Sequence, residues 1–443
     1  MSRFDPQGAL RGELRPPPDK SISHRAAILA AMGEGETRVE AYLDAADTRS
    51  TLDAISAIGA TVNSEQAADG GLSLRIHGVG LRGAGEAEID VGNAGTLLRV
   101  LPGWLAGQGN GAGAGRKVWT LDGDESIRRR PVDRITEPLR AMGAEIDAGD
   151  GLPPLRVAGA NLRGVEYRLP VASAQVKSCL LLAGLLADGP TTVIEPAPSR
   201  DHTERMLHAA GVVIVNSEPT GDAPATVSHT IEATSRVELG EVTVPGDFSS
   251  AAFWLAAGVI VPNSEIRIRG CGLNHTRTGL LPILDRMGAA VETSLAGESG
   301  GEPFGDLLAR HGPLRGTLVH GAEIPLAIDE LPILGLLACF AEGETRVLDA
   351  SELRHKESDR VAALVTGLRE LGADAEELPD GFAVRGSGSL RGGTLDARGD
   401  HRLAMLGAIA GIASRQGVEV RGMDTAAVSY PGFERDLRAL LGG

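Results

Sequence analysis

Asp19-Lys20-Ser21-Ile22-Ser23-His24-Arg25 stands between three prolines, Pro16 to Pro18, and an Ala- and Leu-rich run at 26–31. Because proline is excluded from helix interiors while Ala and Leu favour helices, this stretch predicts the start of a helix. Lys20, Ser21 and Arg25 add two cations and a hydroxyl to an end where backbone N–H groups are unpaired. Such an end can bind a phosphate or a carboxylate. An ordinary capped helix with solvated charges explains this segment alone equally well.

The same arrangement recurs along the chain. Short polar clusters precede Ala-, Leu- and Gly-rich runs at six places that lie 71 to 82 residues apart. A second series of glycines, which end amphipathic stretches, recurs every 68 to 84 residues, and glycine suits the left-handed residue that closes a helix. Six copies of one supersecondary unit explain both series. The clusters are Lys20-Ser21, 92–96, Ser173-Ala174-Gln175, 246–250, Asp329-Glu330 and 400–402, and the glycines are Gly59, Gly143, Gly211, Gly288, Gly372 and Gly442.

Each unit is expected to combine two kinds of helix with short strands. Gly-x-Thr-x-Val segments at 35–39, 189–193 and 343–347 predict strands. The first helix of a unit is apolar on every side and belongs inside a packed domain, and the amphipathic helix covers it. Since 443 residues exceed what one core usually supports, we expect an α/β fold of two domains with three units each.

The domain boundaries follow from the repeats. The second set of three units begins near Val242, which gives one domain at 17–240 and a second that joins 1–16 to 241–443. The strand-like piece before Pro16 has no repeat partner beside it, so we expect it to cross into the second domain.

Composition excludes several classes of function. The formal net charge is −16, from 43 basic and 59 acidic residues, which argues against nucleic acid and anionic membranes as partners. Cys179, Cys271 and Cys339 are odd in number and scattered, so they indicate core positions rather than a disulfide framework or a metal site. No signal-like segment or long apolar run is present, which indicates a cytoplasmic protein. The Gly-rich segment 109–115 precedes a strand and indicates a flexible connection more than a phosphate loop.

Basic residues gather at the predicted helix starts of this acidic protein. Three adjacent arginines at 128–130 cannot all point the same way, so one is expected to reach a ligand, although a solvated charge run is an equally good interpretation. Residues 356–360 alternate in sign, as surface ion-pair patches do, and Asp329-Glu330 could simply cap a helix. The cations considered are Lys20, Arg25, Arg130, Lys356, Arg360 and Arg402.

Three repeated units in each domain would bring these helix starts to one end of that domain. If the two ends faced each other, they would form a cationic cleft for two small anionic substrates. Asp329 and Glu357 would then be available for proton transfer.

The motifs together resemble the 5-enolpyruvylshikimate-3-phosphate synthase (EPSP synthase) family nearly from end to end. The resemblance implies a fold of two similar domains, each with three βαβαββ units arranged as an inside-out α/β barrel. SAQVK, RDHTE and NHTR resemble a variant subgroup that includes glyphosate-tolerant members. The matching motifs are DKSISHR at 19–25, GNAGTLLR at 92–99, GDESIRRRP at 123–131, SAQVK at 173–177, SRDHTE at 199–204, NHTR at 274–277, DELPIL at 329–334, RHKESDR at 354–360 and GDHRLAM at 399–405.

The resemblance also implies the chemistry. The carboxyvinyl group of phosphoenolpyruvate is transferred to the 5-hydroxyl of shikimate 3-phosphate through a tetrahedral intermediate, with release of phosphate and with no metal or organic cofactor. Asp329 would accept the 5-hydroxyl proton, Glu357 would handle protons at the methylene carbon, and Lys20 could assist. The resemblance also implies that the protein is a monomer. By motif match, shikimate 3-phosphate would be held by Lys20, Ser21, Arg25, Ser173, Ala174, Gln175, Arg200, Asp329 and Lys356, and phosphoenolpyruvate by Lys20, Gly95, Arg130, Gln175, Arg360 and Arg402.

Two positions depart from patterns known in the family. Val428 stands where some members carry a substrate-contacting lysine before the final Tyr430-Pro431 motif, so that contact is absent or replaced. Gly95 occupies a position where a tolerant form has alanine. Because glyphosate mimics phosphoenolpyruvate, we expect glyphosate to inhibit this chain.

Three other functions share parts of this pattern. Transfer of the same group to UDP-N-acetylglucosamine usually involves a reactive cysteine in the loop matching 123–131, where this chain has Glu125 and Ser126. A non-catalytic anion-binding protein of the same fold would not need Asp329 and Glu357. The RNA 3′-phosphate cyclase class shares a related repeat, but the acidic charge and the missing adenylylation histidine argue against it.

Overall fold

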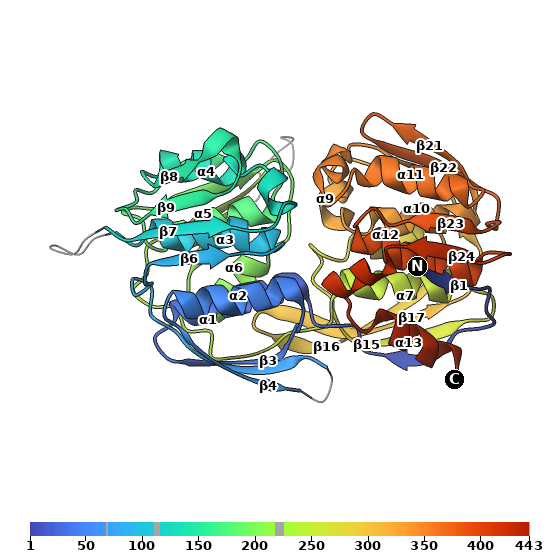
Figure 1. Cartoon of the computed structure of the whole chain (residues 1–443), viewed down its shortest axis with the longest axis horizontal. Helices are drawn as coiled ribbons and strands as arrows, with labels where there is room; N and C mark the ends of the chain where they lie inside the picture. The colour runs from blue at the N-terminus through green and yellow to red at the C-terminus, as the bar shows by residue number, and fades with distance from the viewer. Residues whose placement is uncertain (68–69, 110–115, 218–225, 443) are drawn as a thin grey trace. The chain divides into compact units, whose positions relative to one another are not determined.

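The computed structural model describes residues 1–67, 70–109, 116–217 and 226–442. The chain divides into two compact units (Figure 1). Unit 1 comprises Met1–Pro17, Pro245–Gly297 and Pro303–Gly443, and unit 2 comprises Pro18–Val244 and Glu298–Glu302. The Gly-rich segment discussed above lies outside the described residues at 110–115.

Unit 2 contains three four-stranded sheets with the orders β14-β3-β5-β4, β6-β7-β9-β8 and β10-β11-β13-β12. Each sheet has a parallel first pair followed by antiparallel pairs. The strands are β3 (Glu36–Tyr42), β4 (Thr61–Gln66), β5 (Leu72–His77), β6 (Ala87–Asp90), β7 (Val118–Asp122), β8 (Glu145–Ala148), β9 (Leu155–Ala158), β10 (Glu166–Arg168), β11 (Thr191–Glu195), β12 (Ile214–Ser217), β13 (Val227–Ile231) and β14 (Glu241–Thr243), and the helices are α1 (Lys20–Met32), α2 (Ala46–Ala57), α3 (Gly95–Ala106), α4 (Asp133–Ala141), α5 (Ala174–Gly184) and α6 (His202–Ala209).

Unit 1 repeats the plan, with sheet orders β16-β17-β15-β2, β18-β20-β22-β21 and β1-β24-β23. The strands are β1 (Ser2–Phe4), β2 (Arg11–Leu14), β15 (Glu265–Gly272), β16 (Ala290–Ser299), β17 (Glu302–Arg310), β18 (Leu314–Arg315), β19 (Leu318–Val319), β20 (Ala341–Val347), β21 (Asp374–Leu378), β22 (Gly381–Gly386), β23 (Gly393–Asp396) and β24 (Val418–Arg421), and the helices are α7 (Phe248–Ile260), α8 (Leu280–Arg286), α9 (Glu323–Ala327), α10 (Leu331–Phe340), α11 (Arg360–Glu370), α12 (His401–Ala413) and α13 (Phe433–Leu441). The predicted two-domain α/β fold with six repeats is therefore confirmed.

The leading strands of the first and fourth repeats are exchanged. β2 precedes α1 in the chain but pairs in parallel with β15 of unit 1. β14 precedes α7 but pairs in parallel with β3 of unit 2. The expected boundary after residue 240 therefore differs from the boundary after Val244, because β14 completes the first sheet of unit 2. The N-terminal strand β1 completes the sixth repeat by pairing antiparallel with β24.

Six buried helices begin at the six predicted polar clusters. They are α1, α3 and α5 in unit 2 and α7, α10 and α12 in unit 1. Side chains around almost the whole circumference of these helices are buried, as their apolar composition predicts. Asp19, Ser173, Asp247 and Asp400 cap their helices through the side chain. The helix starts therefore bring the predicted polar residues to the ends of the cores.

Glycines end the amphipathic helices by one repeated geometry. Gly59, Gly143, Gly211, Gly288 and Gly372 have φ between +80° and +111°, and the N–H of the next residue bonds back into the helix, as Ala60 N–H does to the Ile55 carbonyl at 3.0 Å. This is the Schellman closure that favours glycine. Gly442 also ends an amphipathic helix, α13, as predicted, but its φ of −98° is not left-handed.

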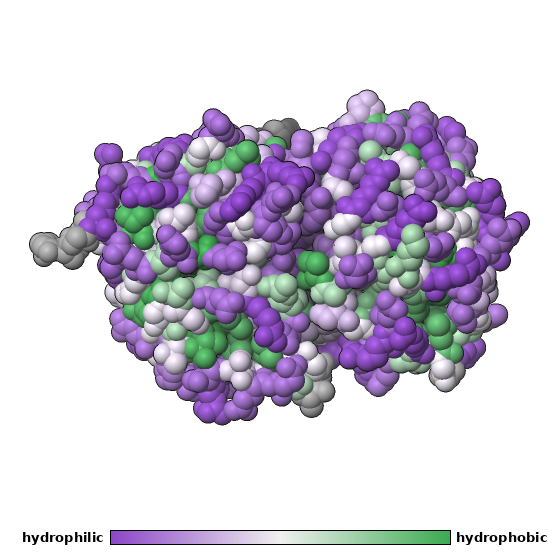
Figure 2. Space-filling model, viewed as in Figure 1, coloured by the Kyte–Doolittle hydropathy of each residue, from purple (hydrophilic) through white to green (hydrophobic). Residues whose placement is uncertain are grey.

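The three cysteines are buried in the two apolar cores, as predicted. Burial raises the pKa of the Cys339 thiol to about 12, which keeps it protonated. On the surface, Figure 2 shows a mostly hydrophilic face with dispersed apolar side chains. Within the described ranges, no helix is long and apolar enough to cross a membrane.

Candidate active site

The start of α1 places a lysine beside a carboxylate. Asp19 accepts a hydrogen bond from the Ile22 N–H at 2.9 Å and so caps the helix. Lys20 is the first helical residue, and its Nζ lies 3.1 Å from Oδ2 of Asp47 in the first turn of α2. Ser21 follows and is partly buried. The predicted helix start therefore exists, with its lysine paired rather than solvated.

Arg25 lies further along α1 and is almost fully buried. Its Nε donates to Thr203 Oγ1 at 2.7 Å, and its Nη2 donates to Ser178 Oγ at 2.9 Å. Burial lowers the pKa of Arg25 to about 10, although the negative charge of Glu204 opposes this, and the positive charge of Arg200 adds to it. The guanidinium therefore stays charged at neutral pH.

His24 makes stability depend on pH. Burial lowers the pKa of His24 to about 3, against the raising influence of Asp47 and with Lys20 and Arg25 adding to it. Below pH 6.5 the His24 side chain binds a proton in the unfolded chain but not in the folded chain. The free energy of unfolding therefore falls as pH drops from about 6.5 towards 3. In urea titrations between pH 7 and 4.5, we expect His24→Gln to remove a slope of up to about 1.4 kcal/mol per pH unit. Parallel curves for both proteins would contradict this assignment.

The starts of α3 and α5 meet at a group of polar side chains. Gln175 Nε2 donates to Thr96 Oγ1 at 3.1 Å, and Arg99 Nη1 donates to Gln175 Oε1 at 3.4 Å. Gly95 is the first residue of α3, and a Cβ atom added there would lie 2.9 Å from Arg130 Nη1. The predicted residues Gly95, Arg130 and Gln175 are therefore brought together. Ser173 and Ala174 form the start of α5 beside them.

The three adjacent arginines have different partners. Arg128 pairs with Asp122 at 2.6 Å, and Arg129 pairs with exposed Glu125 at 3.0 Å. Arg130 instead donates from Nη2 to Asn93 Oδ1 at 2.7 Å and to Ser126 Oγ at 3.2 Å, beside the start of α3. One arginine of the three therefore points towards a helix start, and that it reaches a ligand stays a prediction.

A buried ion cluster forms around Lys177 of α5, the helix that also carries Gln175. It was not predicted from the sequence. Lys177 has no exposed surface, and its Nζ lies 2.6 Å from Glu195 and 2.7 Å from Glu204. His229 Nε2 is 3.2 Å from the same Glu195. Burial disfavours the ammonium, but Glu204 and Glu195 outweigh it and raise the pKa of Lys177. The SAQVK and RDHTE motifs contained two of these residues, while Glu195 and His229 gave no local signal.

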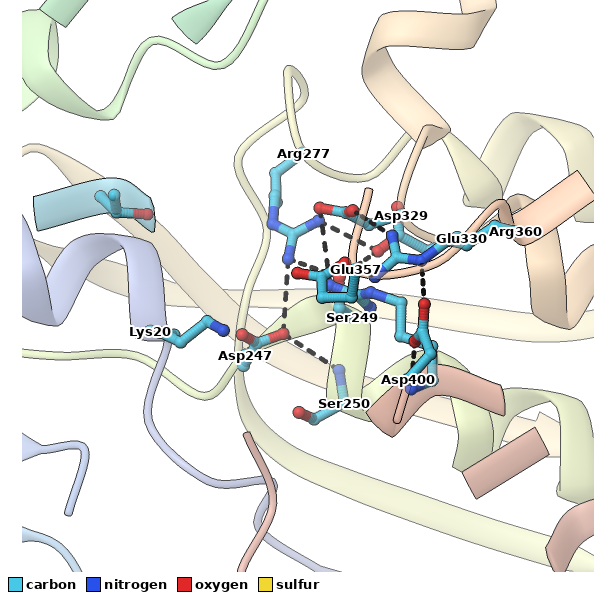
Figure 3. Close-up of polar contacts among 12 residues, drawn as sticks. Lys20, Asp247, Ser249, Ser250, Arg277, Asp329, Glu330, Glu357, Arg360 and Asp400 are labelled. Carbon is cyan, nitrogen blue, oxygen red and sulfur yellow. Dashed lines mark hydrogen bonds and ion pairs between the residues drawn. The ribbon is translucent and has the colours of Figure 1, made fainter. Parts of the chain in front are cut away.

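Unit 1 gathers the predicted carboxylates and arginines around Arg360 (Figure 3). Arg360 is fully buried; its Nε donates to Asp400 at 2.7 Å, its Nη1 to Asp329 at 3.2 Å and its Nη2 to Glu357. Arg402 Nη2 lies 3.5 Å from the other oxygen of Asp329. Burial disfavours the charge of Arg360, but the negative charges of Glu357, Asp400 and Asp329 outweigh this effect and raise the pKa of Arg360.

Three of the six cations do not stand at helix starts, contrary to the prediction: Arg25 lies in the second turn of α1, and Arg130 and Lys356 lie outside the helices. Arg130 follows the 3₁₀ turn Ile127–Arg129, before α4 begins at Asp133. Lys356 follows the 3₁₀ turn Ser351–His355 and is partly buried. For Arg130 and Lys356, the chain forms a short turn just before the cation, which the charge pattern does not reveal, and residues 131–132 and 357–359 separate the cation from the next helix.

Asp329 and Glu330 do not cap α10 through their side chains. Glu330 accepts instead from Arg277 Nη1 at 3.0 Å and from the Ser249 hydroxyl, while Asp329 pairs with Arg360 and Arg402. Arg277 also lies 3.4 Å from Asp247, the cap of α7. Sequence reasoning included the NHTR and DELPIL motifs but did not assign Arg277 or Glu330. At the C-terminal end, Val428 closes the 3₁₀ turn Met423–Val428.

Two α/β units of three repeats, each with basic side chains and carboxylates at buried helix starts, define the enolpyruvyl transferase class of fold. The structure of the enolpyruvyl transferase NikO from Streptomyces tendae is similar in fold, with a TM-score of 0.75 at 20% identity over 99% of this chain and 96% of that one.

Sequence comparison identifies the family. A family model described as EPSP synthase (3-phosphoshikimate 1-carboxyvinyltransferase) matches residues 4–437. A 3-phosphoshikimate 1-carboxyvinyltransferase from Synechococcus sp. (strain JA-3-3Ab) is 48% identical over 99% of this chain and 96% of its own length. An EPSP synthase structure from Acinetobacter baumannii has a TM-score of 0.83 at 37% identity, over 99% of this chain and 97% of that one. The chain belongs to the EPSP synthase family, a family of transferases.

Proposed function

We propose that this chain transfers the enolpyruvyl group of phosphoenolpyruvate to the 5-hydroxyl of shikimate 3-phosphate and releases phosphate, within chorismate and aromatic amino acid biosynthesis. The observation that carries the proposal is the cluster of Asp329, Glu357, Arg360 and Arg402 in unit 1 of a family member. It offers paired carboxylates for proton transfer beside arginines for anions. We call the helix-start residues of unit 2 and the Arg360 cluster of unit 1 the two half-sites. We further propose that both half-sites bind the two substrates.

Shikimate 3-phosphate would be held chiefly by unit 2. A phosphate suits the start of α5, where backbone N–H groups and Ser173 are available, with Arg25 and Arg200 supplying charge. Unit 1 would add Asp329 and Lys356, at the end of the ligand away from its phosphate. The full proposed set is Lys20, Ser21, Arg25, Ser173, Ala174, Gln175, Arg200, Asp329 and Lys356.

Phosphoenolpyruvate carries a carboxylate and a phosphate, and arginine can bind each of these bidentately. Among the residues that the structure describes, Arg402 Nε is buried without a hydrogen-bond partner, so it has a donor to offer. Preorganised cations also stabilise charge on the departing phosphate, which is usually the largest catalytic contribution. The full proposed set is Lys20, Gly95, Arg130, Gln175, Arg360 and Arg402.

The proton transfers follow from the ion pairs. Asp329 lies beside Arg360 and Arg402, and its carboxylate would accept the 5-hydroxyl proton as that oxygen attacks C2 of phosphoenolpyruvate. Glu357 would give a proton to the methylene carbon, which forms the tetrahedral intermediate. The Glu357 carboxylate would then take a proton back from the resulting methyl group as phosphate leaves C2, which restores the enol ether and protonated Glu357. Lys20 could assist these transfers.

The direct test is phosphate release. We expect release that requires both shikimate 3-phosphate and phosphoenolpyruvate, and none when UDP-N-acetylglucosamine replaces the shikimate ester. No metal or organic cofactor should be required, so EDTA should leave the rate unchanged. Release with the UDP-sugar, or no release with both proposed substrates, would contradict the proposal. We also propose that the chain works in the cytoplasm as a monomer, on its family membership.

Replacing Arg130 should weaken phosphoenolpyruvate binding, because this arginine lies beside Gly95 at the start of α3. Loss of hydrogen bonds to a charged ligand predicts a rise in KM for phosphoenolpyruvate of about 10- to 100-fold in Arg130→Ala. Arg128→Ala is the matched control, since Arg128 pairs with Asp122, and its KM should change less than about two-fold. Equal effects in steady-state kinetics would refute the proposed difference.

A methyl group added at Gly95 should crowd the proposed phosphoenolpyruvate site beside Arg130. The added Cβ would lie 2.9 Å from Arg130 Nη1 and 3.1 Å from Arg99 Nη1, so both guanidinium groups would have to shift. We expect glyphosate to inhibit the unaltered chain, and Gly95→Ala to raise both its inhibition constant and the KM for phosphoenolpyruvate. Full activity of the unaltered chain in millimolar glyphosate would show that this expectation is wrong.

A further inference from the structure

Two arginines tie together the starts of the three buried helices in unit 1. Arg360 connects Asp329, which precedes α10, to Asp400, the cap of α12. Arg277 connects Glu330, the cap position of α10, to Asp247, the cap of α7. Arg360 has a proposed role in binding, whereas Arg277 has none so far.

The contacts of Arg277 and Glu330 are deeply buried. Arg277 is 3% exposed and Glu330 is 1% exposed. Arg277 Nη1 donates to Glu330 Oε1 at 3.0 Å, and Arg277 Nη2 donates to Ser249 Oγ at 2.5 Å. The Ser249 hydroxyl also donates to the same Glu330 oxygen. Figure 3 shows the three side chains pointing at one another from the loop after β15, from α7 and from the start of α10.

This geometry acts on the neighbouring residue. Glu330 follows Asp329 directly, so fixing the Glu330 side chain fixes the backbone that carries Asp329. From the other side, the Asp329 carboxylate pairs with Arg360 and Arg402. A buried carboxylate such as Glu330 is costly unless it is paired and hydrogen-bonded, so Arg277 is required to keep it in place. The two ends of Asp329, its backbone and its carboxylate, are thus held by different arginines.

We infer that Arg277 and Glu330 are positioning residues, which hold Asp329 in the geometry needed to accept the proton of the substrate's 5-hydroxyl. The inference rests on the proposed function and adds a supporting pair that touches neither substrate. Misplacing a reacting group by about 1 Å can cost about 100-fold in rate. Removing either member should therefore lower kcat far more than it changes the KM for phosphoenolpyruvate, because four of the six residues proposed to hold that substrate lie in unit 2 and Arg360 keeps Glu357 and Asp400 as partners.

The test is a double-mutant cycle that combines Glu330→Gln with Asp329→Asn. In the unaltered background, Glu330→Gln should lower kcat by about 10- to 100-fold, with a KM for phosphoenolpyruvate within about two-fold. In the Asp329→Asn background it should lower kcat less than about three-fold, because residues that act as a unit are not additive. Calorimetric titration with shikimate 3-phosphate runs the same cycle without turnover: Glu330→Gln should weaken binding only where Asp329 is present.

Further variants keep the test decisive if Glu330→Gln folds poorly. Arg277→Lys keeps the charge but loses the planar guanidinium group that donates to both Glu330 and Ser249. Ser249→Ala removes only the shared hydroxyl. Both variants should lower kcat. Glu323→Gln is the matched control, since Glu323 pairs with Arg286 at the surface, and its kinetics should not change.

Two results would overturn the inference. One is an additive cycle, in which Glu330→Gln costs as much without Asp329 as with it. The other is a set of variants with lowered unfolding midpoints in urea but normal kcat per folded molecule. Failure of the proposed function would look different, because the unaltered chain itself would then release no phosphate.

Discussion

Asp329→Asn should lower kcat by about 10² to 10⁴-fold, the range attributed to a well-placed general base. Asparagine keeps the shape of the side chain but cannot take up the proton that the 5-hydroxyl must lose. Arg360 would retain Glu357 and Asp400 as partners, so the fold of unit 1 should survive. The measurement is the initial rate of phosphate release at saturating concentrations of both substrates, with unfolding in urea as the check on folding.

A kcat within about ten-fold of the unaltered chain would show that Asp329 is not the base. Glu357→Gln should then be compared, since Glu357 is the other carboxylate on Arg360. The surface change Glu323→Gln controls for loss of a carboxylate from the same stretch of chain.

Lys177→Met should cost about 3 to 5 kcal/mol in the free energy of unfolding, as expected when one partner of a buried ion cluster is removed. The change removes the ammonium that lies within 2.7 Å of both Glu195 and Glu204, while His229 stays beside Glu195. Both acids are almost entirely buried, so water cannot compensate. The measurement is equilibrium unfolding in urea at pH 7, followed by far-ultraviolet circular dichroism.

The control for this change lies in a solvated pair. Arg129 and Glu125 have side chains 76% and 86% exposed, and exposed pairs of this kind contribute little. Arg129→Met should leave the unfolding midpoint unchanged. If Lys177→Met also cost less than about 1 kcal/mol, the cluster would not be a stabilising feature of unit 2.

Local patterns in the sequence predicted much of the fold. The clusters at Ser173 and Asp400 predicted helix starts because their side chains can cap a helix next to them in the chain. The glycines that follow α2, α4, α6, α8 and α11 predicted helix ends for a similarly local reason. Gly442 also follows an amphipathic helix, α13, but with φ of −98° it lacks the left-handed conformation of the other five glycines.

Long-range pairings were predicted only in part. The crossing of the segment before Pro16 into the second domain was predicted, and β2 does pair with β15. The pairing of β14 with β3 was not predicted, because nothing in that short strand specifies its partner. The position of Glu330 before an apolar helix also fits a side-chain cap, which it does not form. Only the folded chain brings it to Arg277, 53 residues away.

The most direct test of the central claim is a crystal structure with shikimate 3-phosphate and glyphosate bound. The claim is that half-sites from both units hold two small anions. We predict that the shikimate phosphate contacts Ser173 and Arg25 of unit 2, while its 5-hydroxyl lies within hydrogen-bond distance of Asp329 of unit 1. A shikimate ester held by one unit alone, with Asp329 out of reach of its 5-hydroxyl, would contradict the account.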